Sequence, residues 1–277
     1  MKNVTDVFFD VDYTIADFGP AQRQALDVMV VKYGRDFTEH FGLLFHTILE
    51  GLRAKQGHWD AVPGGQAAYL SLRERMTGLV PSEKPQIWSR ELYALLAGEY
   101  VGKPLTPVAC LEVAETYWSA CADFCRPFSD AVTLAAALER RGVRYHFFTS
   151  SDFRLVFRNG QWQYDPVYSE EKKLPRILRL GKFGVHPTSI SIGDPIDKPE
   201  LEFYRKVLAT AEQMSKATID VRQCMFIGDS FAGDVQVPVE RLGANFGFWL
   251  QRDKPACQIS EKIRSVSSLD EIQIYLE

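Results

Sequence analysis

The sequence of 277 residues has no long apolar run, and its longest apolar stretches are far shorter than a membrane-spanning helix requires. The N-terminus reaches the charged residues Asp6 and Asp10 almost at once, so we expect no signal peptide. Runs of lysine and arginine are absent, as is an acidic tail, because the 32 basic and 36 acidic side chains are spread along the chain. We therefore expect a protein that binds neither membranes nor nucleic acid.

Cysteine is also scarce. The five cysteines are an odd number and include no Cys-x-x-Cys pair. Cys121 and Cys125 lie four residues apart, but neither has a histidine at the spacing of a zinc site. Reduced and mostly buried thiols are the simplest interpretation, and they favour a cytoplasmic protein.

The residues that are present are typical of an ordinary globular protein, with 46% hydrophobic and 25% charged side chains. The length is sufficient for a large core and a smaller second domain. Residues 4–9 form a short β-type run, and the pattern then stays helical until about residue 125. The helical stretches cover residues 20–33, 36–55, 65–77, 84–98 and 106–124.

From residue 127 onward, β and α patterns alternate. The predicted elements are strands at 143–148, 188–192, 223–227 and 245–250, a hairpin at 155–164, and helices at 130–141, 170–180, 200–216, 234–242 and 268–275. This alternation predicts an α/β fold, with a Rossmann-like, mainly parallel sheet and helices on both faces. We expect residues 1–16 and 126–277 to form the α/β core, and residues 17–125 to form an inserted, all-helical domain.

Two carboxylates follow the first predicted strand, in the segment Asp10-Val11-Asp12-Tyr13-Thr14. In an extended chain, residues i and i+2 project to the same face, about 6.5 Å apart. The carboxyl ends of strands are also where ligands bind in open α/β sheets. Crowded carboxylates are costly unless a cation or a shared proton relieves them. The pair therefore predicts a site for a divalent cation or a phosphoryl group.

Three further motifs stand near strand ends. Thr149 and Ser150 follow the strand at 143–148, where a hydroxyl and backbone N–H groups can hold an anionic oxygen, although ordinary helix-capping would use the same residues. Lys198, with Pro199 after it, precedes the helix at 200–216. A helix dipole does not favour a cation at that end, so this charge indicates a nearby anion, with a solvated lysine as the alternative.

The last motif is Gly228-Asp229-Ser230-Phe231-Ala232-Gly233-Asp234. Glycine permits a sharp turn after the strand, which leaves Asp229 at the strand end and Asp234 at the start of the next helix. Oxygen ligands of this kind suit Mg²⁺. The alternative is an ordinary loop in which Asp234 caps the helix.

The order of these four motifs resembles that of the haloacid dehalogenase (HAD) superfamily of phosphohydrolases. The resemblance covers residues 1–16 and 126–250, and its first and fourth motifs are the specific ones. The position of the insertion is similar to the type in which an α-helical cap covers the site. The resemblance implies a phosphatase that uses Mg²⁺ and an aspartyl-phosphate intermediate to hydrolyse a small phosphorylated metabolite. It does not determine the oligomeric state.

The same resemblance implies a role for each motif residue. Asp10 would be the nucleophile, and Asp12 would protonate the leaving oxygen and then deprotonate water. The phosphoryl oxygens and the Mg²⁺ would be held by two overlapping sets of residues. The phosphoryl oxygens would be held by Thr149, Ser150 and Lys198. The metal ion would be bound by Asp10, Asp229 and the backbone carbonyl of Asp12. Asp234 would be a further ligand of the ion or a group that supports the ligands.

Two departures from the family pattern stand out. Tyr13 occupies a position where the family often has glycine. Lys198 lies 49 positions after Thr149, a longer interval than this subgroup leads us to expect, which leaves Lys172 and Lys173 as weaker candidates for the phosphate-binding lysine. The presence of Asp12 favours phosphate transfer over dehalogenation, because displacing halide needs no leaving-group proton. A phosphomutase and a non-catalytic binding protein with this fold remain the alternatives.

Overall fold

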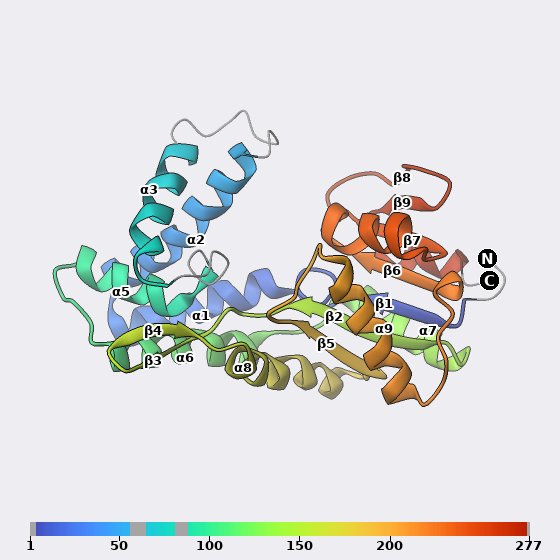
Figure 1. Ribbon diagram of the computed structural model, residues 1–277, viewed down its shortest axis with the longest axis horizontal. Coiled ribbons are helices and arrows are strands. Elements are labelled where there is room, and N and C mark those ends of the chain that lie inside the picture. The colour runs from blue at the N-terminus through green and yellow to red at the C-terminus, as the bar shows by residue number, and fades with distance from the viewer. Residues whose placement is uncertain (1–3, 56–64, 81–87, 276–277) are drawn as a thin grey trace. The chain divides into compact units, whose positions relative to one another are not determined.

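The computed structural model describes residues 4–55, 65–80 and 88–275, and it contains two compact units (Figure 1). The α/β unit consists of Met1–Gly19, Cys125–Ser151 and Leu174–Glu277. The helical unit consists of Pro20–Phe124 and Asp152–Lys173. Within the described ranges, no helix is both long enough and apolar enough to cross a membrane.

Among the described residues, the α/β unit is built on a seven-stranded sheet with the strand order β5-β2-β1-β6-β7-β9-β8. Neighbouring strands of this sheet are parallel, except that β8 and β9 are antiparallel. In chain order the strands are β1 (Asp6–Phe9), β2 (Arg144–Ser150), β5 (Ser189–Gly193), β6 (Cys224–Gly228), β7 (Phe246–Leu250), β8 (Cys257–Gln258) and β9 (Ile263–Val266). The predicted Rossmann-like, mainly parallel sheet is therefore confirmed.

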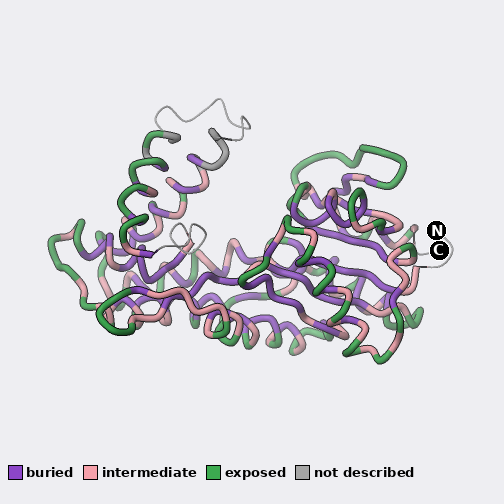
Figure 2. The backbone as a smooth tube through the Cα atoms, in the orientation of Figure 1, coloured by how far each residue is buried: buried purple, intermediate pink, exposed green. Residues whose placement is uncertain are grey.

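The central strands are buried along their whole length, as Figure 2 shows for β1 and β6. A parallel strand that is covered on both faces needs a continuous apolar run, and Val7–Phe9 and Met225–Ile227 supply it. The short strands β8 and β9 are not among the predicted elements. A strand of two residues, Cys257–Gln258, is too short to show any periodicity.

Helices cover the sheet of the α/β unit. α7 (Ser129–Arg140) packs on β2 and α9 (Leu201–Ser215) packs on β5. The unit also contains the end of α8 (Pro166–Leu178), 3₁₀ turns at Arg179–Phe183, Val221–Gln223 and Leu269–Tyr275, and π-helical turns at Phe231–Gln236 and Pro238–Leu242. The aromatic rings of Phe8 and Phe226 stack in the core at 4.7 Å. Phe203 and Tyr204 of α9 belong to the same buried cluster, so α9 is fixed against the strands that end at the site described below.

The helical unit contains five helices among its described residues, together with a β-hairpin and most of α8. These elements are α1 (Phe18–Tyr33), α2 (Arg35–Lys55), α3 (Gly65–Thr77), α5 (Arg90–Tyr100), α6 (Pro107–Phe124), β3 (Leu155–Arg158) and β4 (Gln161–Tyr164). The predicted hairpin has the expected strands. The helix predicted at 84–98 begins at residues outside the described ranges, and its described part runs from Arg90.

The predicted division of the chain placed residues 152–173 in the α/β core, whereas they pack within the helical unit. A buried ion pair explains this grouping. Nε of Arg154 donates to Oε1 of Glu91 on α5 at 2.6 Å, and both side chains are almost fully buried. Arg154 also donates to Glu115 of α6 at 3.1 Å. Removing either partner of such a pair would leave a buried charge uncompensated, so the segment is held firmly to α5 and α6.

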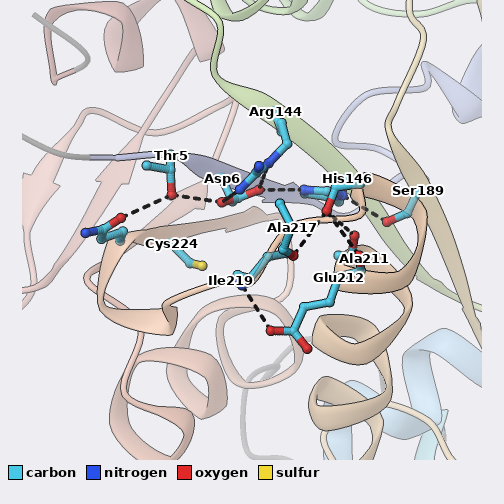
Figure 3. Close-up of polar contacts among 12 residues, drawn as sticks. Thr5, Asp6, Arg144, His146, Ser189, Ala211, Glu212, Ala217, Ile219 and Cys224 are labelled. Carbon is cyan, nitrogen blue, oxygen red and sulfur yellow. Dashed lines mark hydrogen bonds and ion pairs between the residues drawn. The ribbon is translucent and has the colours of Figure 1, made fainter.

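At the amino end of the sheet, the buried Asp6 and His146 side chains link three strands (Figure 3). Asp6 of β1 accepts two hydrogen bonds from the guanidinium of Arg144, both at 2.7 Å, and lies 2.9 Å from Nε2 of His146. The other ring nitrogen of His146 lies 2.9 Å from the Ser189 hydroxyl on β5. Burial alone would raise the pKa of Asp6, but the hydrogen bonds from Arg144, His146 and Thr5 outweigh it and hold the pKa well below its usual range.

We expect Asp6→Asn to lower the free energy of unfolding by about 2–4 kcal/mol, because the buried carboxylate is the shared partner of these groups. Since the pKa of Asp6 is depressed in the folded state, its contribution is present above pH of about 4 and is lost as the pH falls further. Urea unfolding at pH 7 and at low pH measures both effects. Asp220→Asn is the matched control, because Asp220 pairs with Arg222 at the surface. Equal unfolding midpoints for the two variants would contradict the prediction.

Candidate active site

The carboxyl ends of three neighbouring strands bring the predicted site residues together in the α/β unit. The register pairs Phe9 of β1 with Ile227 of β6, and the backbone N–H of Asp10 donates to the carbonyl of Ile227 at 2.9 Å. Asp10 therefore stands level with the end of β6, where Asp229 follows Gly228. Thr149 lies at the end of β2 on the other side of β1. The i and i+2 spacing and the parallel register together create this convergence.

Lys198 bridges two of the carboxylates. Its Nζ donates to Oδ1 of Asp10 at 2.6 Å and to Oδ1 of Asp234 at 2.7 Å, and its side chain is only 11% exposed. Burial would lower the pKa of Lys198, but the two carboxylates outweigh it and raise the pKa well above the usual value. The ammonium is therefore a fixed positive charge beside Asp10.

The two weaker lysine candidates have partners in the helical unit. Lys172 donates to Glu115 at 3.1 Å, and Lys173 forms an ion pair with Asp152 at 3.5 Å. Pro199 precedes the helix as expected, since α9 begins at Leu201 and Glu200 is its N-cap residue. Lys198 thus lies on the loop before α9, where its side chain can reach the carboxylates without belonging to a helical turn.

Asp10, Asp229 and Asp234 form a cluster in which one carboxylate oxygen from each lies within 4.8 Å of the others. Burial, followed by the charges of Asp234 and Asp12, raises the pKa of Asp10 to about 7 against the opposing effect of Lys198. Asp229 is exposed as a whole residue, but desolvation of its carboxyl group and the charges of Asp10 and Asp234 raise its pKa to about 8. Three carboxylates with one ammonium leave the site short of positive charge. Carboxylate oxygens at this spacing fit Mg²⁺, which would supply it.

Asp234 owes its position to the turn before it. Ser230, and not Asp234, caps the π-helical turn at Phe231–Gln236, and its hydroxyl accepts a hydrogen bond from the N–H of Gly233. Oδ2 of Asp234 accepts a hydrogen bond from the N–H of Ser230 at 2.8 Å, which leaves Oδ1 for Lys198. A Cβ at position 228 would overlap the Asp234 carboxyl group, so only glycine fits there.

Thr149 and Ser150 lie at the end of β2, with Thr149 fully buried. The Ser150 hydroxyl donates to Oδ1 of Asp197 at 2.9 Å, so its side chain is used to fix the loop before Lys198. Asp197 was not predicted. The only sequence signal for it was its place beside Lys198, and the contact joins residues 47 positions apart.

Asp12 is bound by Arg176, a partner that the sequence did not predict. Its carboxylate accepts hydrogen bonds from Nη1 of Arg176 at 2.6 Å and from Nη2 at 3.2 Å, and it is not part of the Asp10, Asp229 and Asp234 cluster. The next residue, Tyr13, has φ of 66°, which costs a bulky residue about 1–2 kcal/mol. Its ring packs edge-on against Phe18 at 5.9 Å. A positive φ explains why glycine would suit this position.

The similarity of the chain to known proteins lies in its fold. No family model matches the sequence, and no curated protein matches it. Among solved structures, the chain is similar to the HAD-type hydrolase YfnB of Bacillus subtilis, described bound to magnesium, with 15% identity, a TM-score of 0.62 and 100% of each chain covered. It is also similar to a β-phosphoglucomutase-like protein of Thermotoga maritima (14% identity, TM-score 0.54, 98% of this chain and 97% of that chain).

A third similar structure is a 2-haloacid dehalogenase from Pseudomonas syringae pv. Tomato, with 15% identity and a TM-score of 0.55, covering 99% of this chain and 98% of that chain. The chain therefore has the fold of the HAD-superfamily hydrolases over its full length. These proteins are described as a hydrolase, a β-phosphoglucomutase and a dehalogenase. Because a fold does not imply one reaction, the chemistry has to be argued from the side chains of the site.

Proposed function

We propose that this protein is a Mg²⁺-dependent phosphatase that hydrolyses a small phosphorylated metabolite through an aspartyl-phosphate on Asp10. The observation that carries the proposal is the contact of Asp10 with the buried ammonium of Lys198, beside Asp229 and Asp234. An anionic nucleophile approaches an anionic phosphate only where positive charge offsets the repulsion, and this site is built to provide that charge. Asp12, outside the cluster, remains for proton transfer.

In the first step, a carboxylate oxygen of Asp10 attacks phosphorus while the bond to the leaving oxygen breaks. Asp12 donates its proton to that oxygen as the bond breaks. In the second step, water attacks the phosphorus of the aspartyl-phosphate, Asp12 accepts the water proton, and the bond from phosphorus to Asp10 breaks. Both carboxyl groups then return to their starting states.

Three groups would hold the phosphoryl oxygens through both steps: the ammonium of Lys198, the Thr149 hydroxyl and backbone N–H groups near Ser150. Asp10, Asp229 and the backbone carbonyl of Asp12 would bind Mg²⁺, with Asp234 as a further ligand or a group that orients Lys198. The bound ion would supply positive charge to the phosphoryl oxygens. Dehalogenation is disfavoured, because it has no use for the proton on Asp12.

The helical unit, inserted between the first two motifs, is proposed to act as the cap that selects the substrate. We further propose a cytoplasmic location. All five cysteines lie within the described ranges and are free thiols, and all except Cys257 are buried. Such thiols suit a reducing compartment.

Phosphate release from p-nitrophenyl phosphate and from a panel of sugar phosphates, nucleotides and phosphoglycolate tests the proposal. We expect release with Mg²⁺ and none after EDTA treatment, with activity restored by added Mg²⁺. A mutase would instead convert a sugar monophosphate to its isomer with little free phosphate. Absence of Mg²⁺-dependent release from every compound would refute the phosphatase, and Mg²⁺-dependent binding of a phosphorylated compound without turnover would favour a binding protein.

The raised pKa values of Asp10 and Asp229 predict how Mg²⁺ binding depends on pH. Without metal, the folded protein holds protons that the unfolded chain releases between pH of about 4 and 8, so these two groups reduce stability as the pH rises. Mg²⁺ would displace the protons and reverse the loss, adding about 2.7 kcal/mol at a hundred times its Kd. We expect Mg²⁺ to raise Tm more at pH 8 than at pH 6.

Thermal unfolding at both pH values, with Mg²⁺ and with EDTA, measures this difference. Asp229→Asn should lose most of the Mg²⁺-dependent increase, whereas Asp220→Asn, a surface substitution in the same unit, should keep it. An equal or larger increase at pH 6 in the wild type would show that the carboxylate cluster is not where the ion binds.

A further inference from the structure

The side chain of Arg176 is arranged to hold one carboxylate. It lies near the end of α8, in the α/β unit, and is only 4% exposed. Its Nη1 and Nη2 donate to the two oxygens of Asp12 at 2.6 and 3.2 Å. Its guanidinium carbon lies 4.6 Å from the centre of the buried Phe18 ring. A planar cation packed on a ring and bonded through both nitrogens fixes its partner in one orientation.

Asp12 needs such a partner because of its surroundings. It follows Asp10 by two residues, and the neighbouring cluster of Asp10, Asp229 and Asp234 bonds the Lys198 ammonium and would also hold Mg²⁺. With the ion bound, a carboxylate without a competing cation would be drawn toward that positive charge. In the structure it instead faces Arg176 and remains outside the cluster.

We propose that Arg176 is a positioning residue for Asp12, which keeps this carboxylate out of the cation site and holds it for proton transfer. The part of the proposal that concerns proton transfer rests on the proposed phosphatase function. The two hydrogen bonds from Arg176, together called the fork, still permit that proton transfer, because each carboxylate oxygen has a second lone pair and the Asp12 side chain is 23% exposed. Arg176 itself gains and loses no proton.

The first experiment compares two substrates that differ in their need for a leaving-group proton. Nitrophenolate leaves readily as an anion, whereas the alkoxide of an alkyl phosphate requires protonation. For Arg176→Gln, we expect kcat/KM to fall about 10²-fold or more with an alkyl phosphate and only a few-fold with p-nitrophenyl phosphate. Arg176→Lys keeps the charge without the fork, so we expect it to recover only part of the loss.

The controls separate positioning from a general effect. Arg205→Gln removes an arginine from the exposed face of α9 and should leave both substrates unaffected. If Arg176→Gln folds poorly, Arg176→Lys provides the same comparison. Equal losses of kcat/KM with both substrates, or a rise in KM alone, would overturn the proposal in favour of direct substrate binding by Arg176.

The second experiment needs no turnover and therefore remains decisive if the phosphatase proposal fails. Calorimetric titration with Mg²⁺ is carried out on the wild type, Asp12→Asn, Arg176→Gln and the double variant. We expect Asp12→Asn to change Mg²⁺ affinity little in the wild type but to weaken it about tenfold in the Arg176→Gln background, where Arg176 no longer holds the Asp12 carboxylate away from the cluster. The same effect in both backgrounds would mean that Arg176 contributes only its charge, and the proposal would be wrong.

Discussion

Asp10→Asn is expected to abolish turnover, with a fall of roughly 10⁴-fold or more in kcat against every substrate that the wild type hydrolyses. An amide nitrogen or oxygen does not form the aspartyl-phosphate. Asp229 and Asp234 lie within the same cluster, but Asp234 is bonded to both Lys198 and the Ser230 N–H. Phosphate release under saturating substrate and Mg²⁺ measures the effect.

Loss of folding would not explain this result. Burial and the charge of Asp234 raise the pKa of Asp10 to about 7, so ionising Asp10 costs more in the metal-free folded protein than in the unfolded chain. Removing that charge should leave Tm in EDTA unchanged or raised. An Asp10→Asn variant whose kcat stays within about tenfold of the wild type would show that Asp10 is not the nucleophile.

Lys198→Met is expected to lower both activity and stability. Its ammonium bonds to Asp10 and Asp234, and no other cation that the structure describes bonds to either carboxylate. Without it, we expect the free energy of unfolding in EDTA to fall by about 3–5 kcal/mol, because buried carboxylates are left facing one another. We expect kcat/KM to fall by about 10³-fold, the effect of losing one fixed charge at a reacting oxygen.

Mg²⁺ should separate the two effects of Lys198→Met. The ion would bind the carboxylates and restore part of the stability, but it would not replace the charge that holds the phosphoryl group. Lys206→Met, on the exposed face of α9, is the matched control and should change neither quantity. Recovery of wild-type kcat/KM by Mg²⁺ would argue that Lys198 serves only to neutralise the cluster.

Local patterns predicted the part of the site that depends on strand ends. A buried parallel strand needs a continuous apolar run, and the polar residues directly after such a run must lie at one edge of the sheet. For that reason, the positions of Asp10, Thr149 and Asp229 after three apolar runs were enough to predict that these residues lie at the same edge of the sheet. The helical stretches were predicted for a similar reason, since the apolar face of a helix repeats along its own sequence.

Contacts between distant residues were not predictable in this way. Arg176 meets Asp12 across 164 positions, and nothing in the amphipathic sequence of α8 distinguishes this arginine from its exposed neighbours. The assignment of residues 152–173 to the helical unit depends on Arg154 and Glu91, which are 63 positions apart. Tertiary packing determines which of the many charged side chains are buried in contact with one another.

The sequence alone determined the α/β architecture and the set of carboxylates at the strand ends, because both follow from the periodicity and order of neighbouring residues. Only the tertiary structure decided how those carboxylates are divided. Lys198 joins Asp10 to Asp234, while Arg176 holds Asp12 apart from them. The local sequence determines which charged residues stand at the ends of strands. The partner of each charged residue depends on which side chains the folded chain brings within hydrogen-bonding distance.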